Sequence, residues 1–194
     1  MPLRSGGTWR GERVLETTEA LNRFLGSVER RAFRMARLAA SDEDEALDIV
    51  QDAMLAFVTR YAGKPEDEWA PLFHRTLQNR IIDWHRRSSV RNRLRSWFGG
   101  GSLGEEREDP LEKVADSSSP DPAVSLLRKD LGEAIERALR ELPLRQQQAF
   151  LLRAWEGLDV AGTAFAMGCS EGSVKTHFSR AVHRMRELLE EYTP

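Results

Sequence analysis

The sequence predicts an all-α protein built from two small helical domains that are joined by a flexible acidic linker. Apolar residues recur at three- and four-residue spacing along most of the 194 residues, and strand-like alternation is rare. This spacing is lost from Gly99 to Ala123, where Gly, Ser, Pro and charged residues dominate. Because this length suits one or two domains, we expect a disordered tail at 1–18, domains at 19–98 and 124–194, and the linker at 99–123.

The overall composition narrows the class of protein. The formal net charge of −2 excludes a uniformly basic coat, so the local distribution of charge is more informative. The single cysteine, Cys169, cannot form an internal disulfide, which indicates a reducing compartment. There is no signal-peptide core and no apolar run near the ~18 residues of a membrane span. We therefore expect a soluble, cytoplasmic protein without membrane insertion.

The first predicted helix runs from Ala20 to Ala40, after a glycine-containing tail without apolar periodicity. A second helix begins at Ser41 and Asp44, which resemble a capping box, and continues to about Tyr61. Its apolar stripe predicts these buried residues: Ala46, Ile49, Val50, Ala53, Phe57 and Tyr61.

The second helix is acidic at its start, with six acids and no base from Ser41 to Asp52. The earliest acids complement the helix dipole. Asp48 and Asp52 lie beyond the first turn, however, beside a predicted exposed Leu55. This mixed face predicts a site for a protein partner, and a merely solvated acidic face is the alternative.

A loop at 62–70 leads to a third helix, in which Pro71 suits the first position. Its apolar stripe is Phe73, Leu77, Ile81 and Trp84, and the opposite stripe is Arg75, Asn79, Ile82 and Arg86. The 21 residues from Arg75 to Arg95 contain seven arginines and one acid. Because Trp69 in the loop adds an aromatic ring to a basic surface, this region favours binding of single-stranded nucleic acid.

The second domain is predicted to begin with a helix from Ala123 to Leu142. Pro143 ends it and opens the next helix, Leu144 to Trp155, which leads through Gly157 into a helix-turn-helix.

In that motif Asp159 is placed to cap a short helix from Val160 to Met167. Gly168 permits the tight turn, and Ser170 caps a longer helix that reaches about Leu189. The apolar stripe of the longer helix leaves Ser173, Thr176, Arg180 and His183 on the opposite face. This polar, basic face suits the DNA major groove, whereas an amphipathic helix with a solvated basic face is the alternative.

Five segments of the sequence stand in an order that is typical of one protein family: Asp48-Ile49-Val50-Gln51-Asp52, Leu72 to Arg87, Ala138 to Pro143, Ala149 to Arg153, and Gly168 to Thr176. With these segments the chain resembles the extracytoplasmic-function (group four) sigma factors of bacterial RNA polymerase, in the sigma-70 family. Two departures are that Gly162, Thr163 and Phe165 replace acidic and aliphatic residues, and that His177 stands where the family often has Arg.

The resemblance implies a factor that binds core polymerase, directs it to promoters and helps to open the DNA, with a probable anti-sigma partner and no cofactor. Polymerase would bind Asp48, Ile49, Gln51, Asp52 and Leu55. The minus-ten element, once melted, would bind Trp69, Arg75, Asn79, Arg80, Asp83, Arg86 and Arg87. The duplex minus-thirty-five element would bind Ser170, Ser173, Lys175, Thr176, Ser179 and Arg180.

Two other classes of protein fit the sequence less well. A helix-turn-helix regulator that is not a polymerase subunit would not need the acidic face or the arginine-rich helix. An enzyme is disfavoured because no nucleophile, phosphate loop or cluster of metal ligands is visible. His74 and His85 share a helix face but lie about 16 Å apart at 1.5 Å per residue, too far to share a metal.

Overall fold

The computed structural model describes residues 10–40, 42–97 and 122–192, and within these ranges every regular element is a helix. The all-α prediction is therefore confirmed, while most of the linker expected at 99–123 lies outside the described residues. The elements are α1 (Arg10–Ala39), α2 (Glu43–Tyr61), the 3-10 turn η1 (Glu66–Glu68), α3 (Trp69–Trp97), α4 (Pro122–Glu141), α5 (Leu144–Phe150), the π-helical turn η2 (Leu151–Trp155), α6 (Val160–Met167), α7 (Glu171–Leu188) and the 3-10 turn η3 (Glu190–Tyr192).

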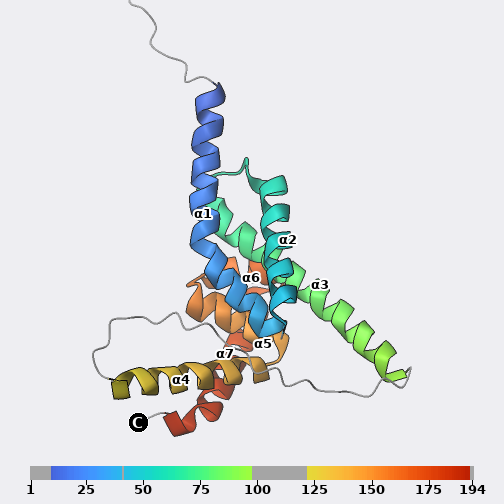
Figure 1. Ribbon diagram of the computed structural model, residues 1–194, viewed down its shortest axis with the longest axis vertical. Coiled ribbons are helices and arrows are strands. Elements are labelled where there is room, and N and C mark those ends of the chain that lie inside the picture. The colour runs from blue at the N-terminus through green and yellow to red at the C-terminus, as the bar shows by residue number, and fades with distance from the viewer. Residues whose placement is uncertain (1–9, 41, 98–121, 193–194) are drawn as a thin grey trace, which may run out of the picture.

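Helices α1 and α2 run side by side, and α3 passes behind them (Figure 1). Helix α1 begins at Arg10, so residues 10–18, expected to be disordered, are helical. The cap of α2 is Asp42, whose carboxylate accepts a hydrogen bond of 3.1 Å from the Glu45 amide, while Ser41 lies outside the described residues. The start of α1 thus lies ten residues before the predicted Ala20, because the segment 10–18 has no apolar period to reveal it, whereas the cap of α2 moves by a single residue.

The third helix begins earlier than predicted. Residues 66–68 form a 3-10 turn, and α3 starts at Trp69 rather than at Pro71. Pro71 is still within the first helical turn, where its missing amide hydrogen costs nothing. As a result Trp69 is fixed to the bundle and does not lie on a free loop.

The helix-turn-helix is confirmed in its local details. Asp159 accepts a hydrogen bond from the Gly162 amide (2.6 Å), and Ser170 accepts one from the Ser173 amide (3.2 Å). Gly168 has φ +62°, a left-handed conformation that side chains resist. The turn and both helix starts are therefore fixed by residues of the motif itself.

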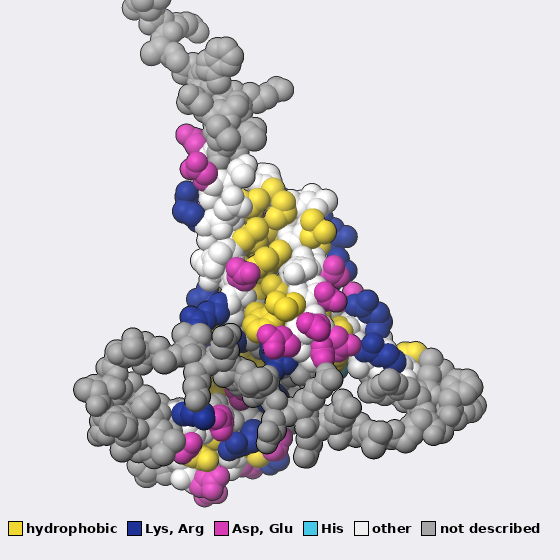
Figure 2. Space-filling view, viewed as in Figure 1, with side chains coloured by type: hydrophobic (Ala, Val, Ile, Leu, Met, Phe, Trp, Pro, Cys, Tyr) yellow, Lys and Arg dark blue, Asp and Glu magenta, His cyan; other side chains and the backbone are white. Residues whose placement is uncertain are grey.

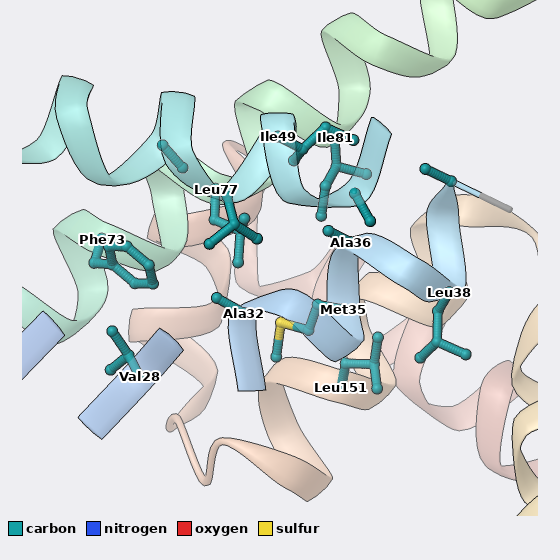
Figure 3. Packing of buried hydrophobic residues seen from close by; sticks show 14 of the residues in the cluster. Val28, Ala32, Met35, Ala36, Leu38, Ile49, Phe73, Leu77, Ile81 and Leu151 are labelled. Atoms are coloured by element: carbon teal, nitrogen blue, oxygen red, sulfur yellow. The ribbon is translucent and has the colours of Figure 1, made fainter. Parts of the chain in front are cut away.

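The main hydrophobic core draws on both halves of the chain. Figure 3 shows Val28, Ala32 and Met35 of α1 near Leu77 of α3, with Leu151 of η2 directed into the same cluster. The same cluster also takes in these residues of α4, α7 and the α4–α5 junction: Ala138, Leu139, Leu142, Ala181 and Met185. A smaller second core joins α5 and η2 to the helix-turn-helix and is made of Ala149, Leu152, Ala164, Ala166, Met167 and Val174.

None of the helices in the described ranges combines the length and the apolar character needed to cross a membrane.

Candidate nucleic-acid and protein interfaces

The outer face of α7 presents the side chains predicted to contact duplex DNA. Lys175, Thr176, Ser179 and Arg180 are exposed, and the helix is anchored on its other side by the buried Val174, Ala181 and Met185. Ser170 is exposed but caps the helix, and the half-buried Ser173 has its hydroxyl 2.9 Å from the Ser170 hydroxyl. Thr176 donates its hydroxyl hydrogen to the Gly172 carbonyl (3.0 Å). Lys175 and Arg180 are thus the exposed charged side chains of this face, and Ser179 lies exposed beside them.

Three residues of α6 depart from the family pattern, and the structure gives each of them a defined contact. A β-carbon on Gly162 would lie 3.0 Å from the capping carboxylate of Asp159, so a glycine leaves room for the cap. Thr163 is fully buried and donates to the Asp159 carbonyl (2.7 Å). Phe165 is 41% exposed, and the Arg75 guanidinium lies over its ring, 4.6 Å from the centroid. The first two support the cap, and the third contacts the other half of the chain.

The acidic face of α2 is open to solvent. Asp48, Gln51 and Asp52 are exposed, and Leu55 is 69% exposed beside them. Ile49 is different: it is only 4% exposed and belongs to the main core, so little of its side chain is available to a partner. Figure 2 shows a hydrophobic strip over α1 and α2 with acidic side chains next to it.

A shallow groove separates the acidic face of α2 from the basic side of α3. The Arg91 guanidinium and the Glu45 carboxylate bridge it at 2.9 Å. Trp84 lines the groove, half-buried, with its indole N–H unbonded within the described structure. The other lining residues are Asp48, Ile49, Gln51, Asp52, Arg80 and Arg87. The residues predicted to bind polymerase and those predicted to bind DNA therefore border one groove.

The outward stripe of α3 is present over most of its length. Asn79, Asp83, Arg86 and Arg87 are exposed, and Arg80 is half-buried. The Arg87 side chain donates through Nε to the Asp83 carbonyl (3.3 Å). The stripe thus offers charge and one amide side chain to a ligand.

Trp69 does not fit the role predicted for it. Its side chain is 2% exposed, and its indole N–H donates to the Lys64 carbonyl (2.9 Å). It also contacts the rings of Phe24 and Phe57 at centroid distances of 5.6 and 6.5 Å. The expectation of an exposed ring at the entrance of a strand-binding site is wrong, because η1 and the first turn of α3 fold this ring into the core.

The structure adds contacts between the halves that sequence periodicity did not predict. Glu156, which directly follows η2, lies 3.3 Å from the Arg31 guanidinium and 3.3 Å from Nε2 of His74. A second contact places the Arg34 guanidinium 5.9 Å from the centre of the Trp155 ring. A glutamate followed by glycine carries no periodic signal, so no local pattern could have revealed this site.

Histidine 85 lies half-buried on α3, against the ring of Trp84 at 5.2 Å. Burial lowers its pKa below 6.5, because desolvation disfavours the charged imidazolium. The lowered pKa favours the neutral imidazole of His85 on α3, a helix that is otherwise rich in positive charge. No group of three His, Cys, Asp or Glu side chains in the described ranges is placed to hold a metal ion.

Comparison with known proteins covers both halves of the chain. A family model described as "Sigma-70, region 4" matches residues 132–185. The ECF RNA polymerase sigma factor SigM of Mycobacterium tuberculosis is 30% identical over 172 residues, covering 88% of this chain and 77% of that protein. The RNA polymerase sigma-E factor of Streptomyces avermitilis is 29% identical over 157 residues, covering 81% of this chain and 78% of that protein.

Two solved structures share the fold at lower sequence identity. The sigma factor RpoE, solved in complex with the anti-sigma factor NepR from Bartonella quintana, has a TM-score of 0.61 at 24% identity, covering 87% of this chain and 96% of that one. CnrH, solved with the cytosolic domain of CnrY, has a TM-score of 0.57 at 15% identity, covering 91% and 96%. Both alignments extend across the two halves of the chain, so the fold is shared over most of its length.

Proposed function

The chain belongs to the ECF RNA polymerase sigma factors, and we propose that it recruits core polymerase through α2 and reads promoter DNA through α3 and α7. The observation that carries this proposal is the similarity to a sigma factor along 88% of the chain, since a match to the helix-turn-helix alone would suit any DNA-binding regulator. The similarity includes the acidic α2 and the basic α3, which such a regulator does not need. A catalytic role has no support among these relatives, which are all sigma factors by name.

We assign polymerase binding to the exposed part of the acidic face on α2. Asp48 and Asp52 are one helical turn apart, and Leu55 beside them exposes an apolar side chain without a structural role. Charged residues around an exposed apolar group favour fast, specific association with a protein partner. Ile49 is left out of this assignment because it is buried.

Promoter reading is divided between two helices. On α7, Arg180 is free to contact a base edge in the major groove, and Lys175 can contact phosphate. On α3, Asn79 carries a donor and an acceptor side by side, which suits the edge of a base that has left the stack. Arg86 and Arg87 lie further along α3 and can hold the phosphates of the displaced strand.

Partners and location follow from this role. Polymerase and promoters meet in the bacterial cytoplasm, where we place the protein. RpoE, which shares the fold, was solved with an anti-sigma factor. We propose that this chain is also controlled by an anti-sigma partner.

The first test is the double variant Asp48→Arg/Asp52→Arg. It should stay folded, because surface changes usually cost under about 0.5 kcal/mol, and it should lose binding to core polymerase in gel filtration. It should also lose promoter-specific transcription in a run-off assay.

The matched control is Glu66→Arg/Asp67→Arg, which reverses two exposed acids on η1 with no predicted polymerase contact. The control should bind core polymerase like the parent. Equal binding by the parent and the α2 variant would show that polymerase binds elsewhere. Failure of the parent itself to bind core polymerase would refute the proposed function.

A further inference from the structure

Helix α6, the first helix of the helix-turn-helix, is short and only weakly fixed by its own side chains. It has eight residues, and Gly162 and the β-branched Thr163 in its interior both disfavour a helix relative to alanine. The side chains that it buries in the smaller core are Ala164, Ala166 and Met167, so two of the three are single methyl groups. Because burial of a small apolar area stabilises a position only weakly, other contacts must fix the place of α6.

Two arginines from the preceding helical segments supply such contacts, one at each end of α6. At the C-terminal end, Arg145 of α5 donates through Nη1 to the Met167 carbonyl at 2.9 Å. At the N-terminal end, Arg153 of η2 donates through Nη1 to the carbonyl of Leu158, one residue before the Asp159 cap. The last carbonyls of a helix have no partner within it, so Arg145 satisfies a group that α6 itself leaves open.

Two buried glutamines fix α5, the helix that carries Arg145. Gln148 is 2% exposed, and its Oε1 accepts a hydrogen bond of 3.3 Å from Nη1 of Arg145. Gln147 donates through Nε2 to the Leu139 carbonyl of α4 at 2.9 Å. The Arg145 guanidinium is therefore oriented by two uncharged acceptors and keeps its full charge, while α5 links the end of α6 to α4.

Arg153 also contacts α7, the second helix of the motif. Its guanidinium lies 5.8 Å from the centre of the Phe178 ring, and that ring stacks on Phe150 of α5 at 6.2 Å. A guanidinium is attracted to an aromatic face. Arg153 thus connects the start of α6 and the middle of α7 to the same supporting helix.

The N-terminal half of α7 depends on α6 for its position. Towards its C-terminus α7 is anchored in the main core by Ala181 and Met185. Towards its N-terminus the buried anchor is Val174, which packs in the smaller core with the side chains of α6. In a helix-turn-helix the N-terminal residues of the second helix contact base edges. A shift of α6 would therefore move the part of α7 that faces the bases.

We propose that Arg145 and Arg153 are positioning residues for promoter reading: they hold α6 at both ends and so set the angle at which α7 enters the major groove. The consequence for promoter binding rests on the proposed function, whereas the effect on α6 is a property of the free chain. A direct phosphate contact is the competing role for Arg145, which is exposed. The two roles differ in outcome, because a phosphate contact affects all DNA sequences alike.

The first experiment measures hydrogen exchange in the free, full-length chain. Arg145→Ala removes a charged donor from a surface hydrogen bond, so the amides of residues 160–169 should exchange about five- to tenfold faster. Arg145→Lys should stay within about twofold of the parent, because an ammonium can still donate to the Met167 carbonyl. Residues 46–57 of α2 are the internal reference and should not change. Parent-like exchange of residues 160–169 in Arg145→Ala would overturn the proposal.

The second experiment measures promoter binding by the holoenzyme. The ratio of affinities for specific and scrambled minus-thirty-five elements should fall about five- to tenfold in Arg145→Ala, with the affinity for the scrambled element and the salt dependence unchanged. Arg145→Lys should restore the ratio. Equal losses on both elements, with a lower salt dependence, would make Arg145 a phosphate contact and overturn its positioning role.

Arg153→Met tests the N-terminal end of α6. Methionine keeps an apolar side chain beside Phe178 but cannot donate to the Leu158 carbonyl, so residues 160–169 should exchange about fivefold faster. Parent-like exchange would overturn the role of Arg153. Because Arg145 is exposed, its variants should fold even if Arg153→Met does not, and they then decide the proposal.

Arg140→Ala is the matched control. Arg140 is an exposed arginine of α4 that pairs with Glu136 of its own helix at 3.7 Å. Its loss removes one positive charge from the same half of the chain, so exchange in residues 160–169 and sequence discrimination should both match the parent. If Arg145→Ala loosens α6 while the parent does not bind core polymerase, the positioning of α6 stands and the proposed function fails. If the parent binds polymerase and α6 is unchanged in the variants, the proposed function stands and this inference fails.

Discussion

Helices α3 and α7 both set an apolar stripe against a basic face, yet their surroundings differ. Helix α7 packs on one side only, and the face opposite Val174 and Ala181 is exposed as its period predicts. Helix α3 packs against α2 on one side and α6 on another. Its polar residues His74 and Gln78 are as buried as its apolar ones, because they face Glu156 after η2 and Met35 of α1. One hydrophobic period describes a helix such as α7, whose neighbours all lie on one side, but it underestimates the burial of a helix such as α3, which is packed on more than one side.

The largest expected effect tests whether the first residue of α3 is buried in the core or exposed to solvent. Trp69→Ala removes a ring that is packed on Phe24 and Phe57, and truncation of such a core aromatic typically costs about 3–5 kcal/mol. Urea denaturation should show this loss. Tyr192→Ala, which truncates an exposed ring on η3, is the control and should change stability little. A stable Trp69 variant with defective transcription only on duplex templates would restore the strand-stacking role.

The next effect concerns the exposed face of α7 and its proposed contacts with promoter DNA. Arg180→Ala should cost about 1–3 kcal/mol in promoter binding if the guanidinium contacts a base edge, and the loss should depend on the minus-thirty-five sequence. Lys175→Ala should weaken binding to all sequences and lower the dependence on salt. Titration of holoenzyme onto promoters with specific and scrambled upstream elements distinguishes the sequence-dependent loss from the general one. Equal losses for Arg180→Ala on both templates would make it a phosphate contact.

A smaller effect concerns the exposed part of α3. Asn79→Ala removes one amide side chain from a face that does no core packing, so stability should not change. Loss of its hydrogen bonds to a base should cost about 0.5–1.5 kcal/mol in open-complex formation. Transcription should fall on a duplex promoter and recover partly on a template with a pre-opened bubble. Equal defects on both templates, together with a lower melting temperature, would show a structural role instead.

The smallest expected effect is the pH dependence of stability that His85, half-buried on α3, contributes. Because the pKa of His85 is lowered in the folded protein, the unfolded chain binds this proton more readily. Stability should therefore fall as the pH drops below about 6.5, the ordinary value for histidine. His85→Gln should remove this part of the pH dependence between pH 7.5 and 5.5 in denaturant titrations. The same pH dependence in parent and variant would contradict the assignment.

Local features were predictable from the sequence, and contacts between distant segments were not. Asp159, Gly168 and Ser170 act within a few residues of themselves, so their cap and turn roles follow from residue type and spacing. The positions of Trp69 and Glu156 depend on which helix happens to lie opposite. The exposed faces of α2 and α7 were also predictable, because each of these helices has one packed side and one exposed side.

The shared hydrophobic core also limits how this protein can be recombined. Met185 of α7 and Leu151 of η2 belong to the same cluster as Met35 of α1, so each half presents a surface shaped for the other. A chimaera that joins residues 1–98 to the C-terminal half of a relative at 30% identity would bring together two surfaces that did not evolve as a pair. Promoter specificities could be exchanged between such relatives more safely by transplanting the solvent-facing residues of α7 than by exchanging whole halves.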